Sequence, residues 1–303
     1  MSIGMELTFL GTSCMVPTKH RNVSGMFLQF RDQGILFDCG EGTQRQMNIA
    51  GIKRTSVTRI LLSHWHGDHV SGLIGLIQTL GHEENGPTLH IYGPAQTKQR
   101  MSHLFNTCIF GNKVDIVVHE MDPVKLERIE DQEEFEIFAA PLDHEVPCIG
   151  YRFVEKDRHN IDKDKMQILG LRSGPHMAQL KEGKSVVVNK KKISPKDIIT
   201  VIKGRSLAYV PDTVLCKGAM DLAEDADLLV SEATYGHDEE EKADKHFHLT
   251  ARQAAQLASQ SGAKKLFLTH FSQRYADVSK IEDDAKMVFP NTICAQDFMR
   301  INV

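Results

Sequence analysis

The segment Ser63–Val70, SHWHGDHV, places four side chains that can bind metal ions within six residues. His64 and His66 are two residues apart and follow the apolar run RILL, which has the pattern of a β-strand. Alternate side chains of a strand point the same way, so both imidazoles can reach one ion. Asp68 and His69 fall where a helix is expected to begin, and they face a different point. The spacing therefore predicts two neighbouring ions about 3.5–4 Å apart.

Three further candidate ligands each follow an apolar, strand-like run. His144 follows FEIFAAPLD, Asp212 follows SLAYVP, and His270 follows LFLT. The carboxyl ends of strands form the sheet edge at which ligand crevices lie. A single histidine after a strand is usually structural, but four sites at one edge favour a metal centre. Nitrogen and carboxylate ligands without a thiolate favour zinc, with manganese or another divalent ion as alternatives.

The composition of the chain is typical of a globular protein that can bury a sizeable core. The 303 residues are 41% hydrophobic and 25% charged. No apolar run approaches the ~18 residues of a membrane span, and the N-terminus lacks the basic region of a signal peptide. The six cysteines are scattered without a C-x-x-C pair, which predicts reduced thiols and a cytoplasmic location.

Strand-like and helix-like patterns recur along most of the chain. Strands are expected over residues 5–11, 26–30, 35–43, 57–64, 88–94, 135–144, 148–153, 206–213, 227–234, 265–272 and 292–303. Helical spacing predicts helices over residues 70–81, 97–105 and 250–263. The result is an α/β chain in which several strands end at a chemically reactive side chain.

The segment 156–205 differs from the rest in both charge and pattern. It carries 13 Lys and Arg against 5 Asp and Glu, a net charge of +8, while the whole chain has a net charge of −4. Its apolar runs are short, which predicts an insertion within a single domain spanning 1–303. A solvated basic surface and a surface for a nucleic-acid backbone both remain possible.

The motif HWHGDH resembles the H-x-H-x-D-H signature of the metallo-β-lactamase superfamily. The ordered set His144, Asp212 and His270 is similar to the later metal-binding positions of that superfamily. The resemblance covers essentially the whole chain. It implies an α/β fold, a four-layer αβ/βα sandwich with a two-metal site at one edge. It does not fix the substrate, because this fold hosts several hydrolytic activities.

Further stretches resemble the ribonuclease Z (tRNase Z) family within this superfamily. They are the loop PTKHRN, the turn LFDCGEGTQRQ, the segments SEATY and FHLTARQAA, the end of LTHFSQRY, and a Gly-Pro pair in SGPH. The matching residues are Pro17, Lys19, Arg21, Asn22, Glu232, His248, Arg274, Tyr275, Gly174 and Pro175. The chain departs from the family pattern at Pro211, Ser231 and Leu249.

This resemblance implies a zinc-dependent endoribonuclease, a two-metal phosphodiesterase that removes the 3′ trailer from precursor tRNA. The cut would fall just after the discriminator nucleotide and leave a 3′-hydroxyl on the tRNA. Two Zn²⁺ ions per subunit are implied, with Mn²⁺ or another divalent ion possible. Residues 156–205 would be a tRNA-binding arm (exosite), and a homodimer and no membrane association are expected. The ligand sets would be His64, His66 and His144 for one ion, Asp68, His69 and His270 for the other, and Asp212 between both.

The resemblance also implies catalytic roles beyond metal binding. Asp68 would orient the attacking hydroxide and accept its proton, and His248 would be the general acid, held by Glu232. The alternative for His248 is a structural residue at the start of a helix. The substrate-binding candidates are Lys19, Arg21, Asn22, Gly174, Pro175 and Arg274. Surface salt bridges would explain Lys19, Arg21 and Arg274 almost as well. Glu41 and the turn GEGT are expected to support the site from below.

Two other functions fit part of the pattern. A hydrolase of small esters, thioesters or lactones would use the same fold and metal site. It would have no need for the PTKHRN loop together with the Gly-Pro arm. A non-catalytic metal-binding module would not need Glu232 and His248.

Overall fold

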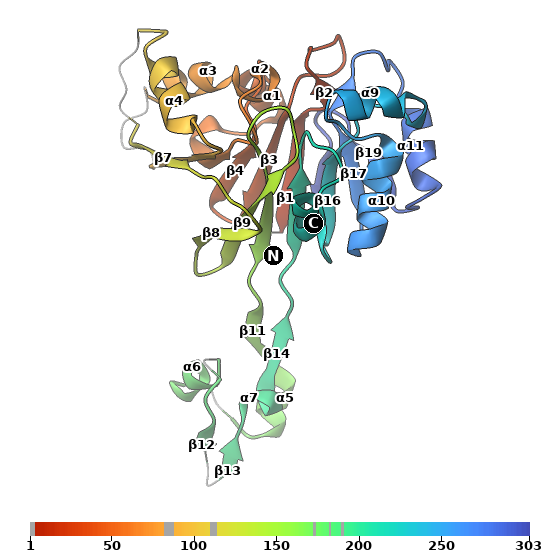
Figure 1. Ribbon diagram of the computed structural model, residues 1–303. Helices are drawn as coiled ribbons and strands as arrows, with labels where there is room; N and C mark the ends of the chain where they lie inside the picture. The colour runs from red at the N-terminus through yellow and green to blue at the C-terminus, as the bar shows by residue number, and fades with distance from the viewer. Residues whose placement is uncertain (1–3, 82–87, 110–113, 172–173, 182, 189–190) are drawn as a thin grey trace. The chain divides into compact units, whose positions relative to one another are not determined.

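The computed structural model describes residues 4–81, 88–109, 114–171, 174–181, 183–188 and 191–303. The chain divides into two compact units (Figure 1). The large unit comprises Met1–Asp131, Ile137–Phe153 and Ser206–Val303, and the small unit comprises Gln132–Glu136 and Val154–Arg205. In the described ranges, no helix is both long enough and apolar enough to cross a membrane.

The first sheet of the large unit has seven strands in the order β20-β1-β3-β4-β5-β6-β7. β1, β3, β4 and β20 pair antiparallel, while β4 to β7 pair parallel. Helices α1 (Thr43–Ala50), α3 (Leu73–Leu80) and α4 (Thr97–Phe105) pack their buried side chains against one face of this sheet. The strands are β20 (Arg300–Asn302), β1 (Met5–Gly11), β3 (Gly25–Phe30), β4 (Gln33–Phe37), β5 (Val57–Leu61), β6 (Leu89–Gly93) and β7 (Ile116–Glu120).

The second sheet also has seven strands, in the order β19-β17-β16-β15-β10-β9-β8. Its outer face is covered by α8 (Lys217–Ala223), α10 (Ala251–Ser261) and α11 (Ser279–Lys286). The parallel strands are β15 (Ser206–Val210), β16 (Leu228–Glu232), β17 (Leu266–Thr269) and β19 (Thr292–Cys294). The other strands are β10 (Cys148–Glu155), β9 (Phe135–Leu142) and β8 (Glu127–Asp131).

The inner faces of the two sheets pack against each other through aromatic side chains. The ring of Phe9 stacks on that of Phe267 at 5.8 Å, and Phe37 meets Tyr209 edge to face at 5.7 Å. Helices therefore cover the outside of two facing sheets, as Figure 1 shows. The expected four-layer αβ/βα sandwich, the metallo-β-lactamase fold, is confirmed.

The helix expected over residues 70–81 is divided in two. A short helix, α2 (Gly67–Val70), ends before α3 begins at Leu73. The break falls at Gly72, where a Cβ atom would lie 2.1 Å from the carbonyl oxygen of Gly40. Helical spacing alone cannot reveal this close approach, because the partner backbone is distant in sequence. The helix over 97–105 is confirmed as α4.

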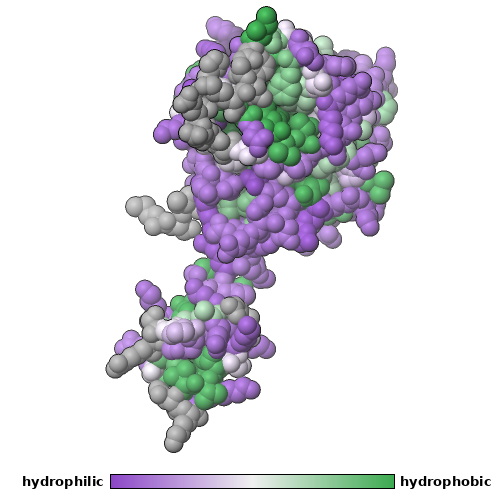
Figure 2. Space-filling view, turned by 90° about the vertical axis from the view of Figure 1, so that its left-hand side faces the viewer, coloured by the Kyte–Doolittle hydropathy of each residue, from purple (hydrophilic) through white to green (hydrophobic). Residues whose placement is uncertain are grey.

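The small unit has a minor core of its own. β11 (Arg158–Ile161) pairs antiparallel with β14 (Ile199–Ile202), and β12 (Val186–Val188) pairs with β13 (Lys191–Ile193). Helices α5 (Lys163–Ile168), α6 (His176–Lys181) and α7 (Pro195–Ile198) complete it. On the face drawn in Figure 2, apolar side chains of this unit lie among hydrophilic ones. The buried core residues are Leu171, Met177, Leu180, Val186, Ile193 and Ile198.

Candidate metal centre

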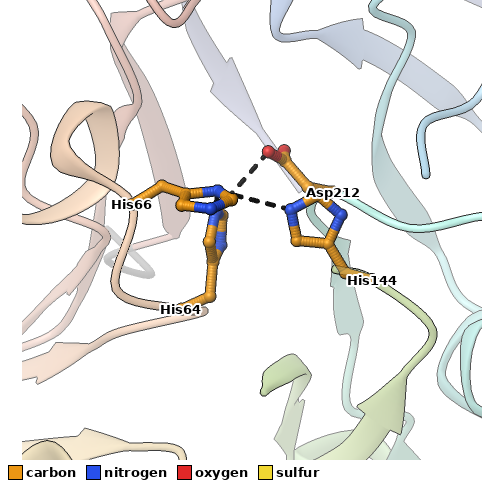
Figure 3. A group of neighbouring side chains, drawn as sticks. All are labelled: His64, His66, His144 and Asp212. Atoms are coloured by element: carbon orange, nitrogen blue, oxygen red, sulfur yellow. Dashed lines mark hydrogen bonds and ion pairs between the residues drawn. The ribbon is translucent and has the colours of Figure 1, made fainter. Parts of the chain in front are cut away.

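The candidate ligands come from four separate segments and meet at one edge of the sandwich. The predicted ligands form two groups, and within each group one ligand atom per residue lies within 4.8 Å of the others. Asp212, His248 and His270 lie equally close together as a third combination. The strands that precede the ligands, β5, β9, β15 and β17, carry their carboxyl ends to this edge, so the folding of the sheets brings the ligands together. The first group is His64, His66, His144 and Asp212 (Figure 3), and the second is Asp68, His69 and His270.

In the first group, three imidazoles and one carboxylate point toward a common centre (Figure 3). His66 Nδ1 lies 3.0 Å from His64 Nε2 and 3.4 Å from His144 Nε2. Asp212 Oδ2 lies 3.6 Å from His64 Nε2. His64 and His66 thus face one point, as their spacing of two residues predicts.

In the second group, two Nε2 atoms and a carboxylate oxygen converge. His69 Nε2 lies 3.3 Å from His270 Nε2, and Asp68 Oδ2 lies 3.5 Å and 3.4 Å from these two nitrogens. Asp212 Oδ2 also lies 3.5 Å from His69 Nε2. The carboxylate of Asp212 therefore reaches both groups.

The second ring nitrogen of four of these histidines is held by a fixed partner. A partner on Nδ1 leaves Nε2 as the nitrogen that faces the centre, and it fixes the orientation of the ring. The contacts are His64 with Ser63 Oγ at 3.0 Å, His69 with Asp38 Oδ2 at 2.8 Å, His144 with the carbonyl of Phe247 at 3.0 Å, and His270 with Thr234 Oγ1 at 2.9 Å.

Asp38 lies beneath the site and was not identified from the sequence. Its fully buried carboxylate accepts hydrogen bonds from the backbone and hydroxyl of Ser63, from the hydroxyl of Tyr209 and from His69 Nδ1, all at 2.7–2.8 Å. The expectation placed such support on Glu41, which instead is exposed and accepts a hydrogen bond from Asn22 through its backbone carbonyl. The sequence does contain a feature that points to Asp38, because this residue directly follows strand β4 in LFDCG, as the predicted ligands follow their strands.

The electrostatics of the cluster suit a divalent cation. Burial raises the pKa of Asp212, but the neighbouring His270 and His69 outweigh it and hold that pKa well below its usual range. Burial lowers the pKa of His64 well below its usual value, which favours the neutral imidazole that a metal binds.

One buried atom in particular fits a bound ion. Asp212 Oδ1 has no hydrogen-bond partner among the described residues, although it lies 3.2 Å from His270 Nδ1. A buried carboxylate oxygen without a donor is costly unless a cation compensates it. A pocket of about 490 Å³ opens onto the cluster and is lined by His66, Asp68, His144 and His248 among others. The residues present therefore fit a two-metal centre that is accessible to a substrate.

The predicted pair Glu232 and His248 is brought together beside the metal ligands. His248 Nδ1 lies 3.0 Å from Oε1 of the fully buried Glu232, and only 12% of the His248 side chain is exposed. Burial lowers the pKa of His248, but Glu232 and Asp212 outweigh it and raise that pKa to about 9. His248 begins no helix itself, because α10 starts at Ala251 and is capped by Thr250.

The residues predicted to bind substrate differ in their contacts and in their exposure. The guanidinium of Arg21 donates to the carbonyl of Tyr275, and Asn22 Nδ2 donates to the carbonyl of Glu41 at 2.7 Å. These two side chains thus connect loops within the large unit. Arg274 pairs with Glu239 at 2.9 Å, and Lys19 is exposed. Gly174 and Pro175 directly precede α6 in the small unit.

The fold and the site together define a metal-dependent hydrolase of the metallo-β-lactamase class. A family model described as a β-lactamase superfamily domain matches residues 178–271, and the model of anti-Pycsar protein Apyc1 matches residues 5–143. The solved structure of the metallo-β-lactamase fold protein YhfI from Bacillus subtilis is 20% identical, with a TM-score of 0.70 over 99% of each chain. At this identity the likeness supports the fold alone.

Relatives with higher sequence identity identify the family within this class of hydrolases. The chain is 40% identical over 300 residues to the ribonuclease Z of Methanothermobacter thermautotrophicus, covering 99% of this chain and 97% of the relative. It is 40% identical to the ribonuclease Z of Rippkaea orientalis, covering 99% and 98%. The structure of human tRNase Z, short form, is 28% identical, with a TM-score of 0.74 over 99% of each chain. The chain belongs to the ribonuclease Z family.

Proposed function

We propose that this protein is a metal-dependent endoribonuclease that removes the 3′ trailer from precursor tRNA. Hydrolysis falls just after the discriminator nucleotide and leaves a 3′-hydroxyl on the tRNA. The observation that carries this proposal is the 40% identity to ribonuclease Z over 99% of the chain. The joint presence of two ligand groups and the Glu232–His248 pair supports it.

Two Zn²⁺ ions are the proposed cofactors, because the ligand atoms are imidazole nitrogens and carboxylate oxygens. Mn²⁺ or another divalent ion would fit the same ligands. His64, His66 and His144 would hold one ion, Asp68, His69 and His270 the other, and Asp212 both. When bound, such ions lower the pKa of water and stabilise charge on a phosphate.

Asp68 is proposed to orient the attacking water and accept its proton. Its carboxylate lies at the rim of the pocket and accepts a hydrogen bond from the backbone N–H of Met15 at 2.8 Å. This contact fixes the carboxylate without using a second side chain. The remaining capacity of the carboxylate is then available for a metal ion and a water molecule.

His248 is proposed to protonate the 3′-oxygen that leaves the trailer. Glu232 occupies Nδ1, so Nε2 is the nitrogen that His248 can offer to the pocket it lines. A histidine with a raised pKa carries the required proton at neutral pH. The ligand histidines are less suited to this step, because one ring nitrogen of each would be committed to an ion.

The small unit is proposed to bind the body of the tRNA. The segment 156–205 has a net charge of +8, which suits a polyanionic backbone. Gly174 and Pro175 match the Gly-Pro motif of the arm in the family. A homodimer in which the arm of one subunit serves the site of the other, and a cytoplasmic location, complete the proposal.

Cleavage of a 3′-extended precursor tRNA tests this function. The metal-loaded protein is compared with a variant in which residues 156–205 are replaced by a short linker. We expect the full-length protein to cut after the discriminator and the linker variant to lose this activity. Both proteins should still hydrolyse a small phosphodiester. Hydrolysis of small esters by both, with no cleavage of tRNA by either, would instead favour a small-molecule hydrolase.

A further inference from the structure

A single hydroxyl joins the metal ligands to the pair formed by Glu232 and His248. We propose that Thr234 is a positioning residue that couples the orientation of His270 to this pair. Thr234 lies two residues after the end of β16 and is 1% exposed. The roles of His270 and His248 in this inference rest on the function proposed above.

The contacts of Thr234 Oγ1 determine the direction of the hydrogen bonds that this hydroxyl makes. It lies 2.6 Å from Glu232 Oε2 and 2.9 Å from His270 Nδ1. A hydroxyl has one proton, and an ionised carboxylate can only accept. The hydroxyl therefore donates to Glu232, its shortest contact, in preference to the carbonyl oxygen of His270 at 3.1 Å, and it accepts from the N–H at Nδ1 of His270. In the neutral imidazole this places the free lone pair on Nε2 of His270, which lies 3.4 Å from Asp68 Oδ2 and 3.3 Å from His69 Nε2.

The other carboxylate oxygen of Glu232 accepts two further hydrogen bonds. Oε1 accepts from His248 Nδ1 at 3.0 Å and from the backbone N–H of Thr213 at 2.9 Å. Thr213 directly follows Asp212, the carboxylate that reaches both ligand groups. One buried carboxylate thus holds the turn at Asp212, the imidazole of His248 and, through Thr234, the imidazole of His270. Because the network is buried and connected, a change at one member is felt by the others.

Removal of the hydroxyl has a specific consequence for the second ligand group. In Thr234→Val the N–H of His270 loses its acceptor, and the nearest carboxylate oxygen is Asp212 Oδ1 at 3.2 Å. Rotation toward this oxygen moves Nε2 away from Asp68 and His69. It also competes with the metal ions for Asp212. The ion held by Asp68, His69 and His270 should therefore bind more weakly than the other ion.

The test compares the Zn²⁺-loaded wild-type protein with Thr234→Val and Thr234→Ser. Stepwise removal of Zn²⁺ by a chromogenic chelator measures the affinity of each ion. Hydrolysis of a small phosphodiester and of precursor tRNA gives kcat and KM. We expect one ion of Thr234→Val to bind about 10–100-fold more weakly, with a much smaller change for the other ion. We also expect a lower kcat at saturating Zn²⁺ with an unchanged KM for tRNA, and recovery of both properties in Thr234→Ser.

The matched control is Thr8→Val, the same substitution at a buried threonine of β1. It should leave both affinities and kcat unchanged. If Thr234→Val does not fold, Thr234→Ala serves as the variant without the hydroxyl.

Wild-type affinities and kcat in the folded variant would overturn the proposal, as would Thr234→Ser behaving like Thr234→Val. Failure of the wild-type protein to cut precursor tRNA would count against the proposed function. The chelator titration would still test the coupling.

Discussion

The histidines of the candidate metal centre differ in the partners of their ring nitrogens and in the ligand groups to which they belong. These differences suggest which histidines bind metal and which one transfers a proton. His64, His69, His144 and His270 each have Nδ1 occupied by an oxygen and Nε2 turned to the ligand cluster. His248 has the same occupied Nδ1, with Glu232 as its partner, and lines the same pocket as His144 and His270. Because both predicted ligand groups are complete without His248, this histidine is available for the proton transfer proposed above.

The first prediction, at this scale, is that His248→Ala slows cleavage of precursor tRNA by about 10²–10⁴-fold while the metal content stays unchanged. The reason is loss of the proton donor for the leaving 3′-oxygen with all the ligands kept. Elemental analysis of the purified protein and single-turnover cleavage check the two parts. His237→Ala, at an exposed histidine paired with Glu240, is the control and should cleave normally. Cleavage by His248→Ala at nearly the wild-type rate would remove the general-acid role.

At the scale of elements, the metal-binding loop is positioned by close backbone contacts. α2 and α3 meet at Gly72, and the loop after β4 passes so near that a Cβ at this position would lie 2.1 Å from the oxygen of Gly40. The carbonyl of Asp68 lies equally close to Gly40, where a Cβ would be 2.2 Å away. The backbone of α2, which carries Asp68 and His69, is thus held against the segment that contains Asp38.

Gly72→Ala should therefore destabilise the large unit by about 1–3 kcal/mol, the usual cost of forcing extra atoms into a packed region. Gly75→Ala is the matched control in the same helix. A Cβ there meets only Gln44 Oε1, at 3.7 Å, and alanine is the better helix former. The control should be neutral or stabilise by up to about 1 kcal/mol. Urea unfolding of both variants measures the difference, and equal stabilities would contradict the packing argument.

At the scale of the whole molecule, charge is distributed unevenly along the chain. The chain has a net charge of −4, whereas the segment 156–205 has +8. Polyanion binding releases counterions, so affinity for tRNA should fall steeply with salt. The lysines responsible need to be exposed, as Lys191 and Lys192 of β13 are.

The logarithm of tRNA affinity should fall with the logarithm of salt concentration. Replacement of both Lys191 and Lys192 by Gln should make this fall less steep, by about 0.7–0.9 in the slope for each lysine that contacts a phosphate. Binding of tRNA measured over a range of NaCl concentrations gives this slope. Lys217 and Lys264 of the large unit, replaced by Gln in the same way, are the control. Each of them pairs with an aspartate, Asp221 or Asp227. A change of slope in the control that matches the change in the arm would argue against a specific role for the small unit.

Much of this protein is determined by local sequence. The alternation of apolar residues predicts the strands, and the residues at their ends, from His64 to His270, predict the ligand set. The extended backbone forces the side chains of His64 and His66 to the same side, so their joint use needs no knowledge of the fold. The capping box of Thr250 with Gln253 and the left-handed Gly262 set the limits of α10 in the same local way.

The tertiary structure alone determined which groups support those ligands. Asp38 follows β4 and Thr234 follows β16, but the ligand histidines that they hold, His69 and His270, lie 31 and 36 residues away in the chain. The break at Gly72 depends likewise on Gly40, which is close in space and distant in sequence. Local patterns report which side of a strand or helix a residue faces. They carry no information about which other segment arrives there, because that follows from how the two sheets pack.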